Sequence, residues 1–159
     1  MITKTDIEKG DIYYASLDPV IGSEQEGNRP VVVVQNNYGN QYNPTLIIAP
    51  LTKILKKPNL PTHVLVNRNY FLKYDSQILL EQIRVIDKTR LINYLGTLTE
   101  QEKQKIDSAL IETFNIDLLG YLRSKGIGEI NNDRTKRLYS QHYCNKNEYN
   151  NKNKYYSNK

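Results

Sequence analysis

Short apolar stretches separated by polar residues run through the first two thirds of the chain and predict a series of β-strands. Tyrosine and aliphatic residues alternate over residues 10–17, a pattern typical of a strand. Four consecutive valines at residues 31–34 are β-branched and too few for a helix, which predicts a strand buried on both faces. Further stretches of this kind lie at residues 45–52, 62–67 and 76–87, the last of them two short strands broken near Glu81.

Proline, glycine and asparagine occupy the segments between these stretches and predict loops. Residues 18–28 hold one proline and two glycines among polar and acidic residues. In residues 36–44, Gly39 and Asn40 suit the positive φ of a turn. Pro50 has no N–H to donate to a ladder, so we expect it to mark an edge or a bulge of its strand rather than a central position.

Residues 97–114 predict an amphipathic helix. Thr99 and Glu102 have the T-x-x-E spacing of a capping box. Helical spacing then places four apolar residues on one face: Ile106, Ala109, Leu110 and Phe114. Several short strands followed by one such helix predict a small, mostly β barrel or sandwich, with the helix packed on it as a plug or lid.

The composition changes near residue 123, after which the chain is rich in Asn, Lys and Tyr and poor in aliphatic residues. Such a segment cannot bury enough apolar surface to offset its ordering entropy. We therefore expect a globular domain over residues 1–122 and a disordered tail over residues 123–159. The tail is either a solvated extension without a role or a source of weak, salt-sensitive RNA affinity.

The basic charge belongs to this tail. The whole chain has a net charge of +5 and a pI of about 9.1. Residues 1–122 carry 13 Lys and Arg against 14 Asp and Glu, whereas residues 123–159 carry 9 against 3. The total charge is therefore no argument that the folded part binds nucleic acid, and such an argument must rest on local residues.

The lengths of the apolar runs and the numbers of cysteine and histidine residues exclude several classes of protein and of metal site. The apolar runs are far too short to cross a bilayer, and the N-terminal residues lack the apolar core of a signal peptide. The single cysteine, Cys144, permits no internal disulfide, so we expect a cytoplasmic protein without a membrane partner. With two histidines and one cysteine the chain offers no zinc ligand set, and we expect no metal and no cofactor.

The loop before the valine strand carries candidate chemistry around Arg29. Because a residue that precedes proline is held extended, Arg29 leaves the loop in a defined direction at the start of a buried strand. Its neighbours offer neutral donors and two flexible glycines, a composition suited to gripping a phosphate: Ser23, Gln25, Asn28, Gly22 and Gly27. The alternative is a surface arginine paired with Glu24 or Glu26.

Four collinear segments resemble one known family. GDIYYASLDPVIGSEQEGNRPVVVVQN, NPTLIIAPLT, PTHV and DSQILLEQIRVIDKTRL are similar to the MazF/PemK-type toxins of type II toxin–antitoxin systems, over residues 9–116. The resemblance implies the fold class mainly β with helices (α+β): a small SH3-like β barrel of the MazF/PemK/CcdB type with a C-terminal amphipathic helix. It also implies a homodimer whose interface shapes an RNA channel, and a cognate antitoxin that blocks the groove and, with the toxin, binds DNA.

The resemblance further implies a metal-independent endoribonuclease that cuts single-stranded mRNA and stops translation. In this family the ribose 2′-hydroxyl attacks the adjacent phosphate and leaves a 2′,3′-cyclic phosphate. Arg29 matches the catalytic arginine, and Thr52 matches the catalytic threonine at the end of the strand TLIIAPLT. A guanidinium directed at the non-bridging oxygens would stabilise the charge of the transition state.

Other residues are candidates for supporting roles. An arginine stays charged, so the group that moves the proton is left open. Glu24 and Asp75 are supporting candidates that could equally be structural. His63, which follows a basic loop, could contact phosphate or be a neutral residue at the start of a strand. A basic patch beside Thr52 would attract the RNA backbone: Lys53, Lys56 and Lys57. Gln82 resembles a family position near the RNA groove, where its amide could contact a base edge; Arg84 is expected to be structural.

Two other functions fit the same fold. A gyrase-poisoning toxin would not need the Arg29 loop together with Thr52, and it resembles proteins with an essential C-terminal tryptophan, which this chain lacks. A catalytically inactive RNA-binding module would keep the fold, and the presence of both Arg29 and Thr52 argues against it.

Overall fold

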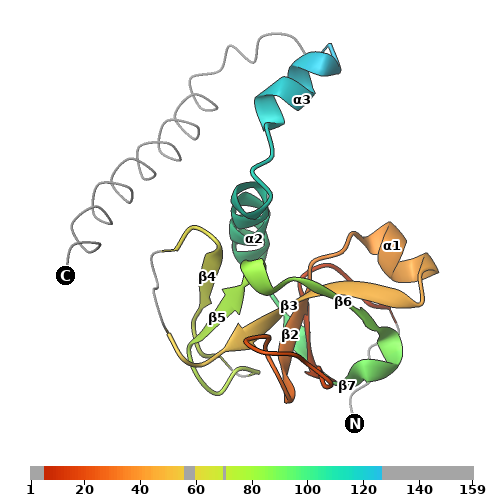
Figure 1. Ribbon diagram of the computed structural model, residues 1–159, viewed down its shortest axis with the longest axis vertical. Coiled ribbons are helices and arrows are strands. Elements are labelled where there is room, and N and C mark those ends of the chain that lie inside the picture. Colours follow the sequence, from red (N-terminus) through yellow and green to blue (C-terminus); the bar gives the residue numbers. More distant parts are fainter. Residues whose placement is uncertain (1–5, 56–59, 70, 127–159) are drawn as a thin grey trace, which may run out of the picture. The chain divides into compact units, whose positions relative to one another are not determined.

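A computed structural model describes residues 6–55, 60–69 and 71–126 (Figure 1). Its strands are β1 (Asp11–Ser16), β2 (Asn28–Val33), β3 (Thr45–Thr52), β4 (His63–Val66), β5 (Ser76–Leu79), β6 (Arg84–Asp87) and β7 (Leu91–Thr97). Its helices are α1 (Asn37–Tyr42), α2 (Glu100–Thr113) and α3 (Leu118–Ser124), with the 3₁₀ turns η1 (Leu80–Gln82) and η2 (Lys88–Arg90). The strands predicted from the apolar stretches are confirmed, including the break near Glu81, which is η1.

All the strand pairs are antiparallel, in the order β4-β5-β3-β2-β1-β7, and β6 pairs with β3. The mainly β class is therefore confirmed. Within the described ranges no ladder joins β4 to β7, so the small SH3-like barrel that was expected is not closed between these two strands. The strand that holds the sheet together is β3, which pairs with three others.

Pro50 lies within the ladder of this central strand, opposite Val31 of β2, so the expected edge or bulge is wrong. The other edge of β3 changes partner at the same place, from β6 at Ile48 to β5 at Leu51. Because Pro50 falls between these two ladders, its missing N–H interrupts neither of them.

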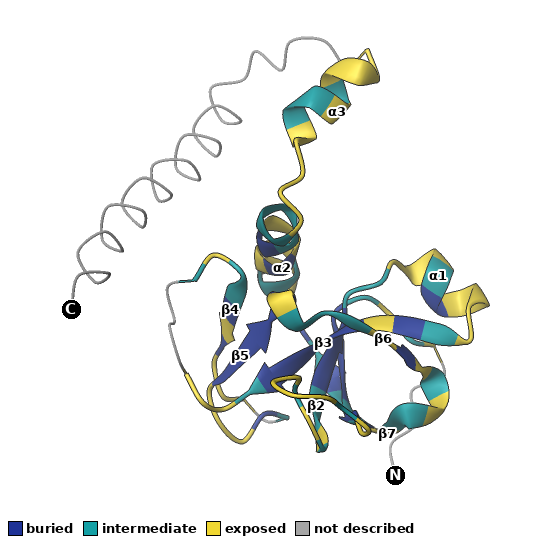
Figure 2. Ribbon diagram, viewed as in Figure 1, coloured by how far each residue is buried: buried dark blue, intermediate teal, exposed yellow. Residues whose placement is uncertain are grey.

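The valine strand has core on both sides, as predicted. Val32 belongs to one buried cluster with Ile12 and Ala49, whereas Val31 and Val33 belong to a second. Figure 2 shows the buried residues concentrated in the strands and the exposed ones in the loops. A strand held from both faces is a rigid support for the residue at its start.

Helix α2 packs against the sheet beside β4 through Ile106 and Ala109, which share a buried cluster with Val64 and Val66. Its capping box is confirmed: the Thr99 hydroxyl accepts from the N–H of Glu102 at 3.3 Å, and the Glu102 carboxylate accepts from the N–H of Thr99 at 2.8 Å.

Two local predictions about α2 and the loop of residues 36–44 need correction. Phe114, at the C-cap of α2, is 60% exposed and does not join the apolar face. Residues 37–42 form α1 rather than a turn, because the side chain of Asn36 caps the N–H of Gly39 at 2.8 Å. Neither Gly39 nor Asn40 has a positive φ.

The chain divides into two compact units, Met1–Ile116 and Asp117–Lys159. In the second unit the structure describes residues 117–126, where α3 begins after Asp117, whose carboxylate accepts from the N–H of Gly120 at 2.9 Å. The expected boundary between residues 122 and 123 falls inside α3. Most of the expected tail, residues 127–159, lies outside the described residues.

No helix in the described part of the chain combines the length and the apolar character needed to cross a membrane.

Candidate active site

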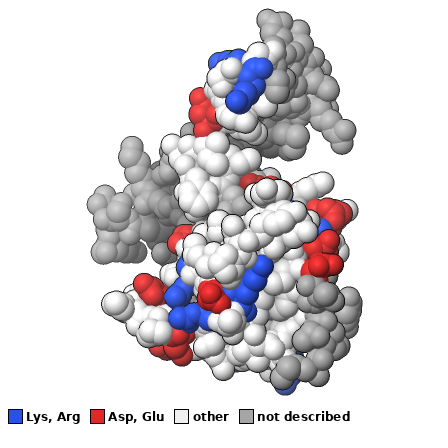
Figure 3. Space-filling model, turned by 90° about the vertical axis from the view of Figure 1, so that its right-hand side faces the viewer, with Lys and Arg blue, Asp and Glu red and all other residues white. Residues whose placement is uncertain are grey.

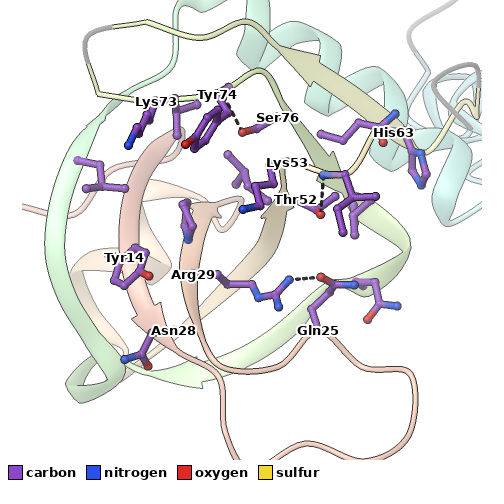
Figure 4. A pocket seen from close by; sticks show the side chains of 18 of the residues that line it. Tyr14, Gln25, Asn28, Arg29, Thr52, Lys53, His63, Lys73, Tyr74 and Ser76 are labelled. Carbon is purple, nitrogen blue, oxygen red and sulfur yellow. Dashed lines mark hydrogen bonds between the residues drawn. The ribbon is translucent and has the colours of Figure 1, made fainter. Parts of the chain in front are cut away.

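A pocket of about 790 Å³ opens between the start of β2, the end of β3 and the segment that leads into β5 (Figure 4). It collects residues that are far apart in the sequence. Those singled out from the sequence that line it are Gln25, Asn28, Arg29, Thr52, Lys53, His63 and Gln82.

Arg29 is held in the pocket by two neutral groups of its own loop. Its Nε donates to the backbone carbonyl of Glu26 at 2.8 Å, and a terminal nitrogen donates to the side-chain oxygen of Gln25. Neither partner is a carboxylate, which disfavours the alternative of a surface ion pair. The contacts use only part of the guanidinium's donors, so others remain for an anion.

The loop itself bends where its glycines predicted. Gly22 and Gly27 have φ of 63° and 73°, in the left-handed region that favours glycine. The N–H of Gly27 donates to the carboxylate of Asp18 at 2.9 Å, which closes the loop at the base of β1 and β2.

Thr52 lines the same pocket as Arg29. The two residues lie on neighbouring strands, each two positions from the last pair of the β2–β3 ladder, Val31 and Pro50. Figure 4 shows both side chains at the pocket. The Thr52 hydroxyl oxygen accepts from the N–H of Ile54 at 3.2 Å, which leaves its hydrogen to donate elsewhere.

An exposed aromatic ring stands between two lysines at the rim. Tyr74 is 52% exposed, with the Nζ of Lys53 at 5.6 Å and that of Lys73 at 5.5 Å from its ring centre. Lys73 and Tyr74 were not predicted from the sequence. The Lys-Tyr pair within a polar turn was the available signal, because alternating basic and aromatic residues are typical of single-strand binding.

His63 is a polar residue in the wall of the pocket whose side chain is mostly buried. Its side chain is 7% exposed, and its Nε2 lies 2.8 Å from a carboxylate oxygen of Glu81. Glu81, which also lines the pocket, was not among the candidates. The two residues are 18 positions apart and meet only because β4 pairs with β5, so the sequence gives no local signal for the contact.

The sequence model of one family, described as the PemK-like, MazF-like toxin of type II toxin-antitoxin systems, matches residues 8–114. The chain belongs to this family. The matched region lies within the first compact unit and contains every residue of the pocket described above. The resemblance inferred from the four segments is confirmed.

Individual relatives agree with this assignment. Endoribonuclease EndoA of Bacillus subtilis (strain 168) is 49% identical to this toxin over 105 residues, which are 65% of this chain and 90% of the relative. A mycobacterial endoribonuclease in complex with its cognate antitoxin has a TM-score of 0.59 at 24% identity, covering 69% of this chain and 96% of the other. MazF of Deinococcus radiodurans has a TM-score of 0.62 at 18% identity, covering 71% and 100%. The two solved structures support the fold alone.

Three candidates for the toxin's site lie outside the lining of the pocket. Glu24 accepts from the N–H of Ile21 at 3.3 Å, and Asp75 accepts from the N–H of Arg68 at 2.7 Å, so each carboxylate supports its own turn. Ser23 contributes its backbone carbonyl, 3.5 Å from the amide nitrogen of Gln82. Lys56 and Lys57 lie outside the described residues.

The toxin also carries cations that serve the fold. Figure 3 shows Lys and Arg side chains gathered on the side of α1, β6 and η2. Arg84 donates to the carbonyl of Leu17 at 3.2 Å, Arg90 to that of Ser16 at 3.2 Å, and Lys88 to that of Asn40 at 2.7 Å. These bonds tie the turns at the ends of β1 and α1 to β6 and η2, which confirms the structural role expected of Arg84.

Proposed function

We propose that this chain is the toxin endoribonuclease of a type II toxin–antitoxin system and cleaves single-stranded RNA in the pocket that contains Arg29 and Thr52. The observation that carries the proposal is the position of these two side chains, on neighbouring strands at one pocket, in a chain 49% identical to an endoribonuclease. Cleavage of mRNA would stop translation in the cytoplasm.

The proposed reaction is an attack of the ribose 2′-oxygen on the adjacent phosphorus. The bond from phosphorus to the 5′-oxygen breaks, which leaves a 2′,3′-cyclic phosphate and a 5′-hydroxyl. Arg29 stabilises the charge that builds on the non-bridging oxygens, and the Thr52 hydroxyl donates to the same oxygens. Within the described residues no three His, Cys, Asp or Glu side chains gather as a metal ligand set.

The attacking hydroxyl must lose a proton and the leaving oxygen must gain one. Arg29 stays charged and is unsuited to the first task. His63 lines the pocket and is oriented by Glu81, whereas Glu24 and Asp75 bond to backbone N–H groups outside it. We assign both transfers to the imidazole of His63, which takes the proton of the 2′-hydroxyl and delivers a proton to the leaving 5′-oxygen.

The rim supplies contacts suited to an unpaired strand. Tyr74 offers an exposed face on which a base can stack, and Lys53 and Lys73 are placed to contact the flanking phosphates. Gln82 adds an amide that can reach a base edge. A duplex would hide the base faces that this arrangement needs.

The proposed assembly is a homodimer that is inhibited by a cognate antitoxin. Ile47 and Val85 are paired across β3 and β6 and are 37% and 59% exposed, an apolar surface that a second copy would cover. One structural neighbour is an endoribonuclease in complex with its cognate antitoxin. A segment of the antitoxin that folds on binding would block the pocket.

The test is digestion of a defined single-stranded RNA by the purified protein in EDTA, followed by sequencing of the RNA ends. We expect 2′,3′-cyclic phosphate ends from the parent. Arg29→Ala should cleave at least about 100-fold more slowly with an unchanged fold, because a positioned donor to the transition state is lost.

Lys105→Ala is the matched control, since it removes one positive charge from an exposed position on α2 and should cleave like the parent. Equal rates in Arg29→Ala and the parent would refute the role of Arg29. An absence of cleavage by the parent would refute the proposed function.

A further inference from the structure

Gln77 is a buried amide without a partner in the wall of the pocket. It occupies the middle of β5, is 1% exposed and lines the pocket. Among the residues that the structure describes, neither its side-chain oxygen nor its side-chain nitrogen has a hydrogen-bond partner. Both ends of one amide are therefore unsatisfied, which is rare in folded proteins and calls for an explanation outside the fold.

The surroundings of Gln77 would suit an apolar side chain. On the same face of the sheet, Leu65 pairs with it across β4 and β5, and Leu79, two residues along β5, is a buried aliphatic residue. A leucine or methionine at position 77 would avoid the desolvation penalty of the amide without breaking a bond that the described structure contains. The amide thus makes no identified contribution to the stability of the free protein, and its partner is expected to arrive with a ligand.

The position of Gln77 in the sheet identifies that ligand. Gln77 pairs directly with Thr52 across β3 and β5. Directly paired residues share a face of the sheet, so Gln77 lies on the same face as Thr52. Arg29, at the start of β2, lines the same pocket as these two residues. Adjacent strands are about 4.8 Å apart, so the amide lies one strand away from the proposed catalytic hydroxyl.

We propose that Gln77 reads the base of a nucleotide beside the cleaved phosphodiester, and so sets part of the cleavage motif. This inference rests on the proposed function, because it requires RNA to occupy the pocket. A phosphate offers only acceptors and would leave the amide oxygen unpaired. A base edge with a donor next to an acceptor satisfies both ends of the amide at once. Adenine, through N6 and N7, is the usual partner of such an amide.

The position makes this role distinct from that of Gln82. The Gln82 amide already donates to the carbonyl of Ser23, at 3.5 Å, and lies in η1. Gln77 belongs to a strand, and among the described residues both polar atoms of its amide are buried and unpaired. Once a base reaches this amide, the wrong base leaves it unsatisfied in a buried place, so Gln77 discriminates between bases more sharply than an exposed amide would.

The test is digestion of a randomised single-stranded RNA pool by the full-length parent, Gln77→Leu and Gln77→Glu, with sequencing of all ends and a melting temperature for each protein. Gln77→Leu should still cleave, should melt no lower than the parent, and should lose preference at one motif position by about 10- to 100-fold. Gln77→Glu, which can only accept, should shift that position toward cytosine. Gln77→Met provides a second apolar variant of similar volume.

Asn40→Leu is the matched control, because Asn40 is a buried amide in α1 outside the pocket, and its nitrogen donates to the carbonyl of Gln35 at 3.1 Å. It should melt lower than the parent and keep the parent motif. A purely structural role for Gln77 would give the same pattern as this control.

The outcomes separate the two proposals. Cleavage by the parent together with an unchanged motif in folded Gln77→Leu would overturn base reading and leave the proposed function intact. An equal rate loss at all motifs would also overturn it, since that result indicates positioning of Thr52. Unfolding of both Gln77→Leu and Gln77→Met would overturn it as well, because the amide would then be needed by the fold. If the parent does not cleave, the proposed function itself fails.

Discussion

At the scale of single residues, the site depends on groups whose partners leave capacity for a substrate. Arg29 bonds to a carbonyl and an amide rather than to a carboxylate, so its charge is not neutralised before RNA arrives. Thr52 accepts one backbone hydrogen bond and keeps its own hydrogen. A charged donor and a neutral donor are thereby available to the same phosphate without breaking a bond of the protein's own.

Substitution of Thr52 tests this arrangement. Thr52→Val keeps the shape of the side chain and removes the hydroxyl, and should slow single-turnover RNA cleavage on the order of 100-fold, because one donor to the transition state is lost. Thr52→Ser keeps the hydroxyl and should retain most of the rate. If the valine variant cleaves as fast as the serine variant, the hydroxyl has no role in the reaction.

At the scale of elements, features that depend on residues adjacent in sequence could be predicted, whereas contacts made by strand pairing could not. The valine strand and the capping box of α2 were predicted because each depends on residues adjacent in sequence. The short helix α1 was missed because Gly39 and the flanking asparagines are typical of turns, although Asn36 is also a good N-cap. Gln77 and Glu81 were missed because strand pairing brings them to Thr52 and His63.

The assignment of Arg29 and Thr52 had a different origin. Residue chemistry alone made Arg29 a plausible phosphate ligand and gave Thr52 no distinction from any threonine that ends a strand. The family resemblance paired the two residues, and the register of β2 and β3 supplies the physical reason for that pairing. The pairing depends on residues 23 positions apart in the chain.

The capping box of α2 should be measurable in the stability of the domain. Thr99→Ala removes the acceptor for the N–H of Glu102 and should lower the free energy of unfolding by about 1 kcal/mol, measured by denaturant titration. Ser108→Ala, on the same helix, removes a hydroxyl that bonds only to the carbonyl of Gln104, and should change stability by less than about 0.5 kcal/mol. Equal effects would contradict a special role for the cap.

The turn η2 should make stability depend on pH through Asp87. Hydrogen bonds from the hydroxyl of Thr89, at 2.7 Å, and from its backbone N–H, at 2.8 Å, lower the pKa of Asp87 from its ordinary value of 3.8, with a smaller contribution from Arg90. Because the pKa of Asp87 is lower in the folded protein than in the unfolded chain, its carboxylate stabilises the fold fully at a pH above the unfolded-state pKa. This stabilisation is lost as the pH falls through the folded-state pKa.

Asp87→Ala should therefore melt lower than the parent at pH 7, and the difference should shrink as the pH falls below about 4. Thr89→Val removes the leading cause of the shift and keeps the backbone donor, so its melting curve should show a smaller effect of the same direction. If the difference in melting temperature between Asp87→Ala and the parent stays constant down to pH 2, Asp87 is not the origin of the pH dependence of stability.

At the scale of the whole molecule, the catalytic function is assigned to the first compact unit. The family match ends at residue 114 and that unit ends at Ile116, whereas the excess of positive charge lies in residues 123–159. The proposed catalytic residues and most of the excess positive charge therefore lie in different parts of the chain.

Removal of residues 117–159 should leave the melting temperature and the cleavage motif unchanged and should reduce the dependence of RNA affinity on salt, because fewer phosphate contacts release counterions. The measurement is RNA affinity against salt concentration, made with the Arg29→Ala background so that the RNA stays intact. A full-length chain with the 9 Lys and Arg of residues 123–159 replaced by Gln is the matched control and should show the same reduced slope. An unfolded truncation would show that the first unit needs the second.

The central strand β3 also determines which changes of length the protein can tolerate. Its alternation sets Thr52 toward the pocket and Leu51 into the core. One residue inserted between positions 48 and 52 would exchange these two directions, and the hydroxyl would face aliphatic side chains while a leucine faced the RNA. Insertions in the loop of residues 18–27 shift no ladder. Variation in length is therefore closed to this strand and open only to the part of the loop before Gln25 and Glu26, which hold Arg29.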